Sequence, residues 1–362
     1  MKYLLNISAN LSSPPFLGAH RGEGRWEKNV LSALLQENKQ VHTTRKIWEN
    51  SNPRPYNLWH GTNEEWIKES VLLVHSAGMS LYVEREDVKA FVLHFYETPF
   101  GDAKEHFLRL LKEKRAIATA SHYNPFIFNK LTESFGVENV YQLSGSLVPD
   151  VDMNADNFRK PYITWTNRNF ISHLKSDPGG MEQLLAYLDS KITQEPELRI
   201  KLIVSIWDSD LLNPTHDMMR DYVLSFPSFQ KFKHLYKNID IYAGLDWIDL
   251  LNILKNTRYI ISPAEPASAC PNEAAMYGIP SIVNNNVNPF MTLDGGTLFP
   301  EVIKSVPGIS LDFLLKLDKL HNDHDYYSTS GNAYRNYVKN NTTFKAYTQK
   351  LNNIILERGW FE

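Results

Sequence analysis

The sequence predicts an α/β protein made of two domains, each built around a parallel sheet. In both halves of the chain, short apolar segments of strand length alternate with amphipathic segments of helix length. The length of 362 residues also fits two domains of ordinary size. We therefore expect a Rossmann-like domain over residues 1–153, a second over 154–340, and a C-terminal helix over 341–362.

Apolar segments in the first domain read as buried strands of a parallel sheet. They are residues 1–8, 71–75, 90–96 and 116–121. Trp26, Val30 and Leu34 recur at helical spacing and predict an amphipathic helix after the first strand. Ligands bind beyond the carboxyl ends of parallel strands. The polar residues at these ends are His75, Tyr96, Glu97, Ser121 and His122.

The second domain repeats this alternation. Its predicted strands are residues 161–165, 201–207, 239–243 and 259–261, and its predicted helices begin at Met181 and Trp247. A loop over 166–180 separates the first of these strands from the first helix. Near the end of the chain, an amphipathic pattern predicts a terminal helix. Its apolar positions are Phe344, Tyr347, Leu351, Ile354 and Ile355.

Composition narrows the possible partners and location. The net charge of −3 gives no global electrostatic signal for nucleic acid or an anionic membrane. The one cysteine, Cys270, cannot form an internal disulfide, which fits a reducing compartment. The first apolar run is too short for a signal peptide or a membrane span. We expect a cytoplasmic protein, with peripheral attachment at the inner face of a membrane as an alternative.

Residues 262–283 contain the most informative pattern. Glu265 and Glu273 are separated by seven residues, and an apolar strand lies on each side of this segment. We expect Glu273 to open a helix, whose free N–H groups suit an anionic ligand such as a diphosphate. Carboxylates accept hydrogen bonds from sugar hydroxyls. A nucleotide-sugar requires both kinds of contact. The same residues also fit an ordinary βαβ unit whose helix has a glutamate in its first turn and a glycine cap.

This segment resembles the E-x7-E signature of retaining GT-B glycosyltransferases, especially glycosyltransferase family 4. The residues that match, or lie one place off, are Glu265, Glu273, Ala274, Met276, Gly278, Pro280 and Ile282. The resemblance implies two Rossmann-like domains that face a central cleft, with the acceptor on the side of the first. It implies a nucleoside-diphosphate sugar in the second domain, a terminal helix that crosses back to the first, and hexosyl transfer without metal or cofactor.

The resemblance also implies roles for individual residues. Arg168 and Lys175 would hold the donor diphosphate, and Glu273 the ribose hydroxyls. Many members of the family carry a histidine at the position of Tyr96, and His94 shares that face of the strand. The catalytic candidates are Glu265, Arg168, Lys175, Tyr96 and His94. The donor-binding candidates are Glu273, Ser268, Ala269, Asn272, Gly244 and Leu245, and the cleft loop of the first domain offers Gly18, His20, Arg21 and Gly22.

Several alternatives remain open from the sequence. Metal-dependent GT-A transferases use Asp-x-Asp, which occurs at 150–152 and 208–210. A GT-B nucleotide-sugar epimerase or a non-catalytic partner of an active transferase would share the fold. A dinucleotide cofactor is set aside because the glycines after the first strand lack the required spacing. The sugar, the base, the oligomeric state and the acceptor, whether glycan, lipid, small molecule, protein or nucleic acid, are not identified by the sequence.

Overall fold

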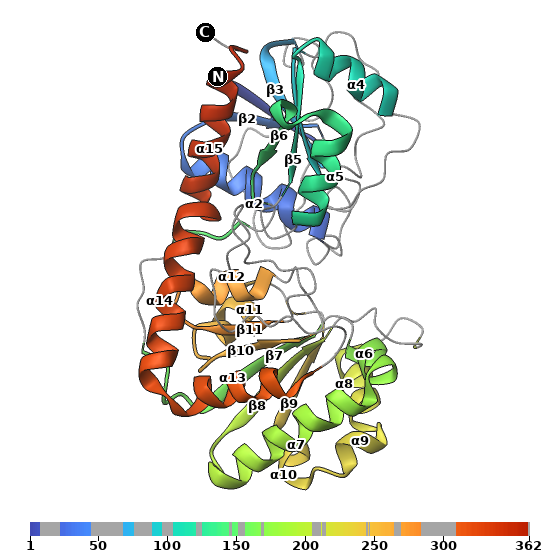
Figure 1. The fold of residues 1–362 in the computed structure, drawn as a ribbon, viewed down its shortest axis with the longest axis vertical. Coiled ribbons are helices and arrows are strands. Elements are labelled where there is room, and N and C mark those ends of the chain that lie inside the picture. Colours follow the sequence, from blue (N-terminus) through green and yellow to red (C-terminus); the bar gives the residue numbers. More distant parts are fainter. Residues whose placement is uncertain are drawn as a thin grey trace. The chain divides into compact units, whose positions relative to one another are not determined.

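The computed structural model divides the chain into two compact units. Unit 1 comprises Met1–Asp150 and Lys339–Glu362, and unit 2 comprises Val151–Val338. The structure describes residues 1–7, 22–44, 68–75, 89–95, 104–120, 125–144, 147–150, 156–167, 170–204, 211, 215–243, 245, 247–263, 269–283 and 309–360. Figure 1 labels the helices and strands of both units.

Unit 1 contains a six-stranded sheet in which every pairing is parallel. The strand order is β2-β1-β3-β4-β5-β6. The strands are β1 (Lys2–Leu5), β2 (Gln40–Thr43), β3 (Ser70–His75), β4 (Ala90–Phe95), β5 (Ala116–Ala120) and β6 (Val140–Gln142). The four strands predicted from apolar segments are present, and the two edge strands β2 and β6 are additional.

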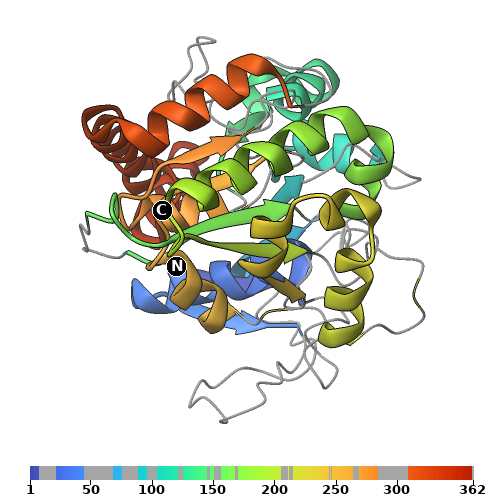
Figure 2. The same cartoon turned by 90° about the horizontal axis from the view of Figure 1, so that it is seen from below.

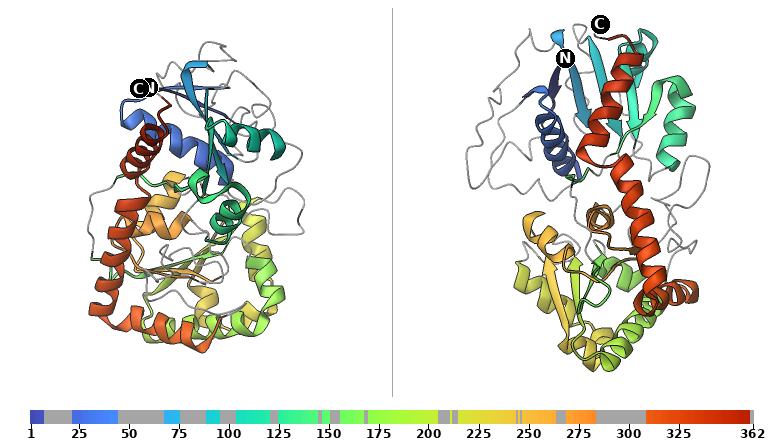
Figure 3. Two further views of the ribbon diagram at one scale, coloured as in Figure 1. Left: turned by 45° about the horizontal axis from the view of Figure 1, so that its top comes forward. Right: turned by 90° about the vertical axis from the view of Figure 1, so that its left-hand side faces the viewer.

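Helices cover both faces of the unit 1 sheet. On one face, α2 (Gly22–Gln36) and the C-terminal helix α15 (Phe344–Glu357) pack against each other and the sheet. Figure 3 shows α15 crossing the strands of this unit. On the other face, α4 (Lys104–Lys112) and α5 (Pro125–Phe135) bury an aromatic cluster with the strands. The predicted terminal helix is therefore confirmed.

Unit 2 contains a five-stranded parallel sheet in the order β11-β10-β7-β8-β9. The strands are β7 (Tyr162–Asn167), β8 (Arg199–Val204), β9 (Ile239–Ala243), β10 (Ile260–Ser262) and β11 (Ser281–Val283). From β7 the chain adds β8 and β9 on one side, then returns to add β10 and β11 on the other. The order therefore reverses between β7 and β10.

The two faces of the unit 2 sheet are covered by different helices. On one face, α7 (Pro178–Gln194) and α13 (Leu311–Asn322) belong to the main apolar core, and Figure 2 shows α7 in yellow-green along this sheet. On the other, α11 (Trp247–Leu254) and α12 (Ala269–Ala275) pack over β10. The remaining helices of this unit are α6 (Phe170–Ser176), α8 (His216–Leu224), α9 (Pro227–Gln230), α10 (Lys233–Lys237) and the first part of α14 (His324–Asn341).

The loop predicted over 166–180 contains a helix, α6, so this part of the prediction was wrong. Phe170, Ile171 and Leu174 lie on the buried side of α6. Asp177 ends this segment and caps the next helix, because its side chain accepts from the backbone N–H of Gly180 at 3.0 Å. The apolar spacing of 170–174 is short but helical, and burial stabilises it.

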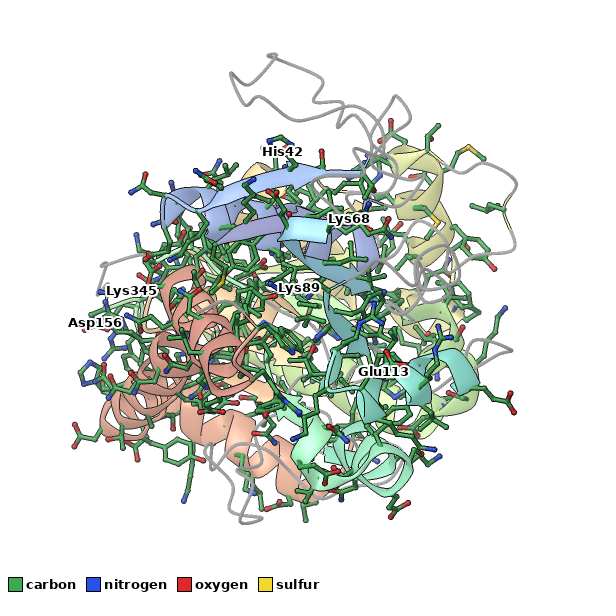
Figure 4. The ribbon with its side chains drawn as sticks, turned by 90° about the horizontal axis from the view of Figure 1, so that it is seen from above. His42, Lys68, Lys89, Glu113, Asp156 and Lys345 are labelled. Atoms are coloured by element: carbon green, nitrogen blue, oxygen red, sulfur yellow. The ribbon has the colours of Figure 1, made fainter. Side chains whose placement is uncertain are left out.

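The chain returns to unit 1 beside the point where it first leaves. Val148 donates its N–H to Thr342 O at 3.0 Å and accepts from the N–H of Phe344 at 3.0 Å. The Asp150 carboxylate accepts from the backbone N–H of Lys345 at 3.2 Å, a residue labelled in Figure 4. Asp150, the first acid of one predicted Asp-x-Asp triplet, thus contacts the start of α15. Residues 151–155 and 205–210 lie outside the described residues.

Candidate functional site

The reversal of strand order in unit 2 marks a place where ligands bind in open parallel sheets. Strand β7 ends at Asn167 and its neighbour β10 ends at Ser262. Their register pairs Ile261 with Trp165, so the two carboxyl ends lie side by side. In the sequence, Arg168 directly follows β7 and Glu265 follows β10. The loops predicted to hold the donor therefore begin at adjacent strand ends.

Helix α12 carries Glu273, and it begins earlier than the sequence predicts. Its first residue is Ala269, so Glu273 lies in the second turn rather than opening the helix. Pro271 is compatible with this start because the N–H groups of a first turn have no intrahelical partner. Gly278 follows the helix at φ 75°, a left-handed conformation that favours glycine. The Glu273 side chain is only 1% exposed, so this carboxylate is buried.

A chain of polar side chains connects the end of β7 to α6 and α7. The Asn167 amide Nδ2 lies 3.4 Å from His173 Nδ1, and His173 Nε2 lies 3.8 Å from the Asp177 carboxylate. The same carboxylate accepts from the N–H of Ile309 at 3.3 Å. Burial lowers the pKa of His173, and Asp177 opposes that shift. Sequence reasoning missed His173; its i, i+4 spacing from Asp177 was the available signal.

Asn167 also contributes a polar atom that has no partner among the residues that the structure describes. Its side chain is fully buried, and Oδ1 has no hydrogen-bond partner among the described residues. Thr166, the preceding residue, is 5% exposed, and its hydroxyl also has no hydrogen-bond partner within the described chain. Buried polar atoms are normally hydrogen-bonded. These two therefore mark the carboxyl end of β7 as a place suited to a polar ligand.

Unit 1 has a second polar cluster, at the carboxyl ends of β3 and β4. The register places His75 opposite His94, and His94 opposite Thr119. The Trp26 ring of α2 stacks on His94 with centroids 5.3 Å apart, and approaches His75 at 5.6 Å. Glu27 beside it is 1% exposed. The cluster combines two imidazoles and an indole from elements far apart in the sequence.

The hydrogen bonds of His94 define its state. His94 Nδ1 lies 3.0 Å from the Thr119 hydroxyl, which donates to Leu93 O at 3.4 Å. With that direction, Nδ1–H donates to Thr119 and Nε2 keeps its lone pair. Nε2 has no hydrogen-bond partner in the part of the chain that the structure describes. Burial, and secondarily His75, hold the pKa of His94 well below its usual value, so the ring is neutral.

The opposite, amino edge of the same sheet is charged. Lys68, Lys89 and Glu113, labelled in Figure 4, come shortly before β3, β4 and β5. Glu113 pairs with Arg115 at 2.8 Å, and this pair is partly exposed, so it contributes little to stability. At the carboxyl edge, the described residues His75, His94 and Thr119 are instead buried. This is the edge at which ligands bind in parallel sheets.

Four further candidates, Lys175, Leu245, Ala269 and Gly22, lie among the described residues. Lys175 is exposed on α6. Leu245, half-buried, follows β9. Ala269 and Gly22 are the first residues of α12 and α2. Eight candidates lie outside the described residues: Gly18, His20, Arg21, Tyr96, Arg168, Gly244, Glu265 and Ser268.

Within the described ranges, no group of three or more His, Cys, Asp or Glu side chains is arranged to hold a metal ion. In the same parts of the chain, helices are either too short or too polar to cross a bilayer.

Comparison with known proteins identifies the fold. No family model and no curated protein matches this sequence. A solved glycosyltransferase from Rickettsia africae ESF-5 is 14% identical, with a TM-score of 0.60 over 99% of this chain and 98% of that chain. WaaG, a glycosyltransferase involved in lipopolysaccharide biosynthesis, is 12% identical, with a TM-score of 0.55 over 98% and 99%. S. aureus MnaA in complex with UDP is 14% identical, with a TM-score of 0.54 over 99% and 97%.

Longer structures match only in part. This chain spans 55% of the length of TarM, with 11% identity and a TM-score of 0.50. The full-length matches and the two parallel-sheet units together show a GT-B fold. At these identities the likeness shows the fold alone.

Proposed function

We propose that this chain is a retaining, metal-independent glycosyltransferase that transfers a hexose from a nucleoside-diphosphate sugar. The reversal of strand order in unit 2 carries the proposal. It places the end of β7 beside the end of β10. In the sequence, Arg168 follows β7, and Glu265 and Glu273 follow β10. Phosphates are bound by cations and sugar hydroxyls by carboxylates. The segments that leave these two strands contain both.

Each predicted residue has a role in this proposal. Glu273 accepts from the ribose hydroxyls, and Glu265 from hydroxyls of the transferred sugar. Arg168 and Lys175 stabilise the charge that grows on the diphosphate as its bond to the sugar breaks. Glu273 is 1% exposed, and a buried carboxylate discriminates strongly between ligands that do and do not offer it a matching hydroxyl.

His94 is proposed to act from unit 1 on the transferred sugar or on the attacking hydroxyl. Its ring is neutral, and its Nε2, which has no hydrogen-bond partner in the described part of the chain, has a lone pair that accepts a hydrogen bond from a hydroxyl. Tyr96, two residues later in the sequence, is the other candidate for this role. The variants of His94 in the Discussion separate a substrate contact from a packing role.

The proposal is tested by a thermal-shift panel of nucleoside-diphosphate sugars, followed by measurement of released nucleoside diphosphate. We expect sugars of one nucleoside diphosphate to raise the melting temperature and that nucleoside diphosphate to be released. Both the thermal shift and the release are expected to persist in EDTA. An α-linked product from an α-linked donor, read by NMR, supports the retaining outcome. Loss of activity in EDTA with recovery in manganese contradicts metal independence.

A matched pair of variants connects binding to the proposed site. Glu273→Gln keeps the volume of the side chain and removes its charge, so UDP or the base found in the panel is expected to bind about tenfold more weakly. Glu182→Gln alters an exposed carboxylate on α7 that pairs with Lys231 at 3.0 Å, and affinity is expected to stay unchanged. Calorimetry measures both. Unchanged affinity in Glu273→Gln removes Glu273 from the site.

The other GT-B activities give different products. An epimerase inverts one carbon of the donor sugar, and its product is again a nucleotide-sugar. It gives no product in which the sugar is joined to an acceptor. A non-catalytic partner binds the nucleotide-sugar and gives no turnover in the wild type. Either result replaces the transferase proposal.

A further inference from the structure

Helix α14 contacts α12 and the residues just before β10 through one buried stripe. Its buried residues include Tyr327, Gly331 and Tyr334, which recur at intervals of four and three and so share one face. The Tyr327 hydroxyl donates to Arg258 O at 2.6 Å, just before β10 begins. Farther along, the stripe reaches α12. The same helix continues past Val338 into residues of unit 1.

Tyr334 holds α12 through a buried hydrogen bond. Its hydroxyl donates to Asn272 Oδ1, with Tyr334 fully buried and Asn272 only 4% exposed. Successive residues of a helix project about 100° apart around its axis. Asn272 immediately precedes Glu273, so fixing the Asn272 side chain also fixes the rotation of α12 that directs Glu273.

Gly331 makes a second contact with the end of α12. A Cβ atom at this position would lie 2.2 Å from Gly278 O and 3.4 Å from Pro280 Cδ. The backbone of α14 therefore approaches the turn that ends α12 more closely than any residue with a side chain allows. The two contacts fix both the rotation and the position of α12.

We propose that Tyr334 is a positioning residue for the donor site, acting through Asn272 on α12 and Glu273. This inference rests on the proposed function. Asn272, one of the donor-binding candidates, has its carbonyl oxygen engaged by Tyr334, so its main contribution is to orient the helix. Donor affinity then depends on a hydroxyl group that does not touch the donor.

The test compares two tyrosines of the same helix. Tyr334→Phe removes the hydroxyl that reaches α12, and Tyr327→Phe removes a similarly buried hydroxyl that reaches Arg258 instead. Tyr334→Phe is expected to weaken UDP binding by about tenfold in calorimetry, because Asn272 loses its buried partner. Tyr327→Phe is expected to bind UDP as the wild type does, with a comparable loss of stability.

Hydrogen exchange gives a readout that does not depend on the ligand. In the absence of nucleotide, Tyr334→Phe is expected to exchange about tenfold faster over residues 269–277, with β7 and α7 unchanged. Tyr327→Phe is expected to leave 269–277 at the wild-type rate. Equal exchange and equal UDP affinity in the two variants overturn the inference.

The inference and the proposed function fail separately. If the wild type binds UDP and Tyr334→Phe binds it equally well, the positioning role is wrong and the proposed function stands. If the wild type binds none of UDP, GDP, ADP, CDP or dTDP, the proposed function fails. Exchange over 269–277 then decides whether Tyr334 positions α12: a wild-type rate in Tyr334→Phe rejects the role, and a faster rate supports it.

Discussion

Two buried histidines, one in each unit, differ in how completely their nitrogens are bonded. In unit 2, His321 Nε2 lies 2.8 Å from the Glu195 carboxylate and Nδ1 lies 2.9 Å from the Tyr259 hydroxyl. Arg258 completes the group with a 3.0 Å bond to Glu195. In unit 1, His94 bonds to Thr119 through Nδ1, and Nε2 has no hydrogen-bond partner among the described residues.

The difference follows the two edges of a parallel sheet. Arg258 and Tyr259 directly precede β10, so the His321 group lies at the amino edge, where parallel sheets rarely bind ligands. His94 is at the carboxyl edge of its sheet. A buried unpaired atom lowers stability and is retained where it serves a function. The comparison therefore indicates a structural role for His321 and supports the proposed substrate-binding role of His94.

The largest expected effect is on stability, from His321→Phe. Phenylalanine fills the space but leaves the Tyr259 hydroxyl and the Arg258–Glu195 pair without their central partner. The free energy of unfolding of unit 2 is expected to fall by about 3 kcal/mol. Hydrogen exchange over 156–204, analysed separately from unit 1, measures it. A loss below about 1 kcal/mol contradicts the structural role.

Acid is expected to destabilise both units over one pH range. Burial lowers the pKa of His321 and of His75 from 6.5 to about 4, with Arg258 also lowering that of His321. Between pH 6.5 and 4 the unfolded chain binds a proton at each group that the folded chain does not, so stability falls as pH falls. Each group contributes on the order of 2–3 kcal/mol over this range.

Chemical denaturation from pH 7.5 to 4 measures this dependence. These two histidines are expected to add no pH dependence to stability above pH 6.5, and to lower stability as the pH falls below it. In His321→Phe, the free energy of unfolding of unit 2 is expected to depend less on pH than in the wild type. The pH dependence of unit 1 is expected to stay unchanged. An unchanged slope in unit 2 shows that His321 titrates with an ordinary pKa.

His94→Phe is expected to give the opposite result from His321→Phe. The new ring keeps the stack on Trp26. Loss of the hydrogen bond to Thr119 is offset by removal of Nε2, a buried atom with no hydrogen-bond partner among the described residues, so unit 1 stability is expected to change by less than about 1 kcal/mol. Turnover is expected to fall at least about tenfold if Nε2 contacts the substrate. Denaturation and release of nucleoside diphosphate measure the two effects. A stable variant with full turnover assigns His94 to packing alone.

The sequence predicted what depends on local pattern. Strands such as β3 and β4 are buried on both faces and read as continuous apolar runs, whereas the edge strands β2 and β6 are partly exposed and carry too few apolar residues to be recognised. Glu265 and Glu273 were found because their spacing lies within one loop and helix. The roles of both remain predictions.

The groups that the sequence did not predict are assembled across long separations. His321 meets residues 195, 258 and 259 only after α13 packs on the sheet, and Tyr334 meets Asn272 from 62 positions away. No periodicity links such residues, because their proximity is set by tertiary packing. The start of α12 was also misplaced, since Pro271 reads as a helix boundary although a first turn accepts it.

The smallest expected effect on turnover comes from Thr119→Val, which tests whether the orientation of His94 matters beyond its presence. Valine keeps the β-branched shape in β5 and removes the hydroxyl that lies 3.0 Å from His94 Nδ1. The hydroxyl's bonds to His94 Nδ1 and Leu93 O are both lost, so unit 1 stability is expected to fall by about 1–2 kcal/mol. Turnover is expected to fall about threefold, less than in His94→Phe, because Nε2 remains but its tautomer is no longer fixed. The double variant should be no slower than His94→Phe, since both changes act through one ring. Additive losses in turnover would place Thr119 in contact with the substrate independently of His94.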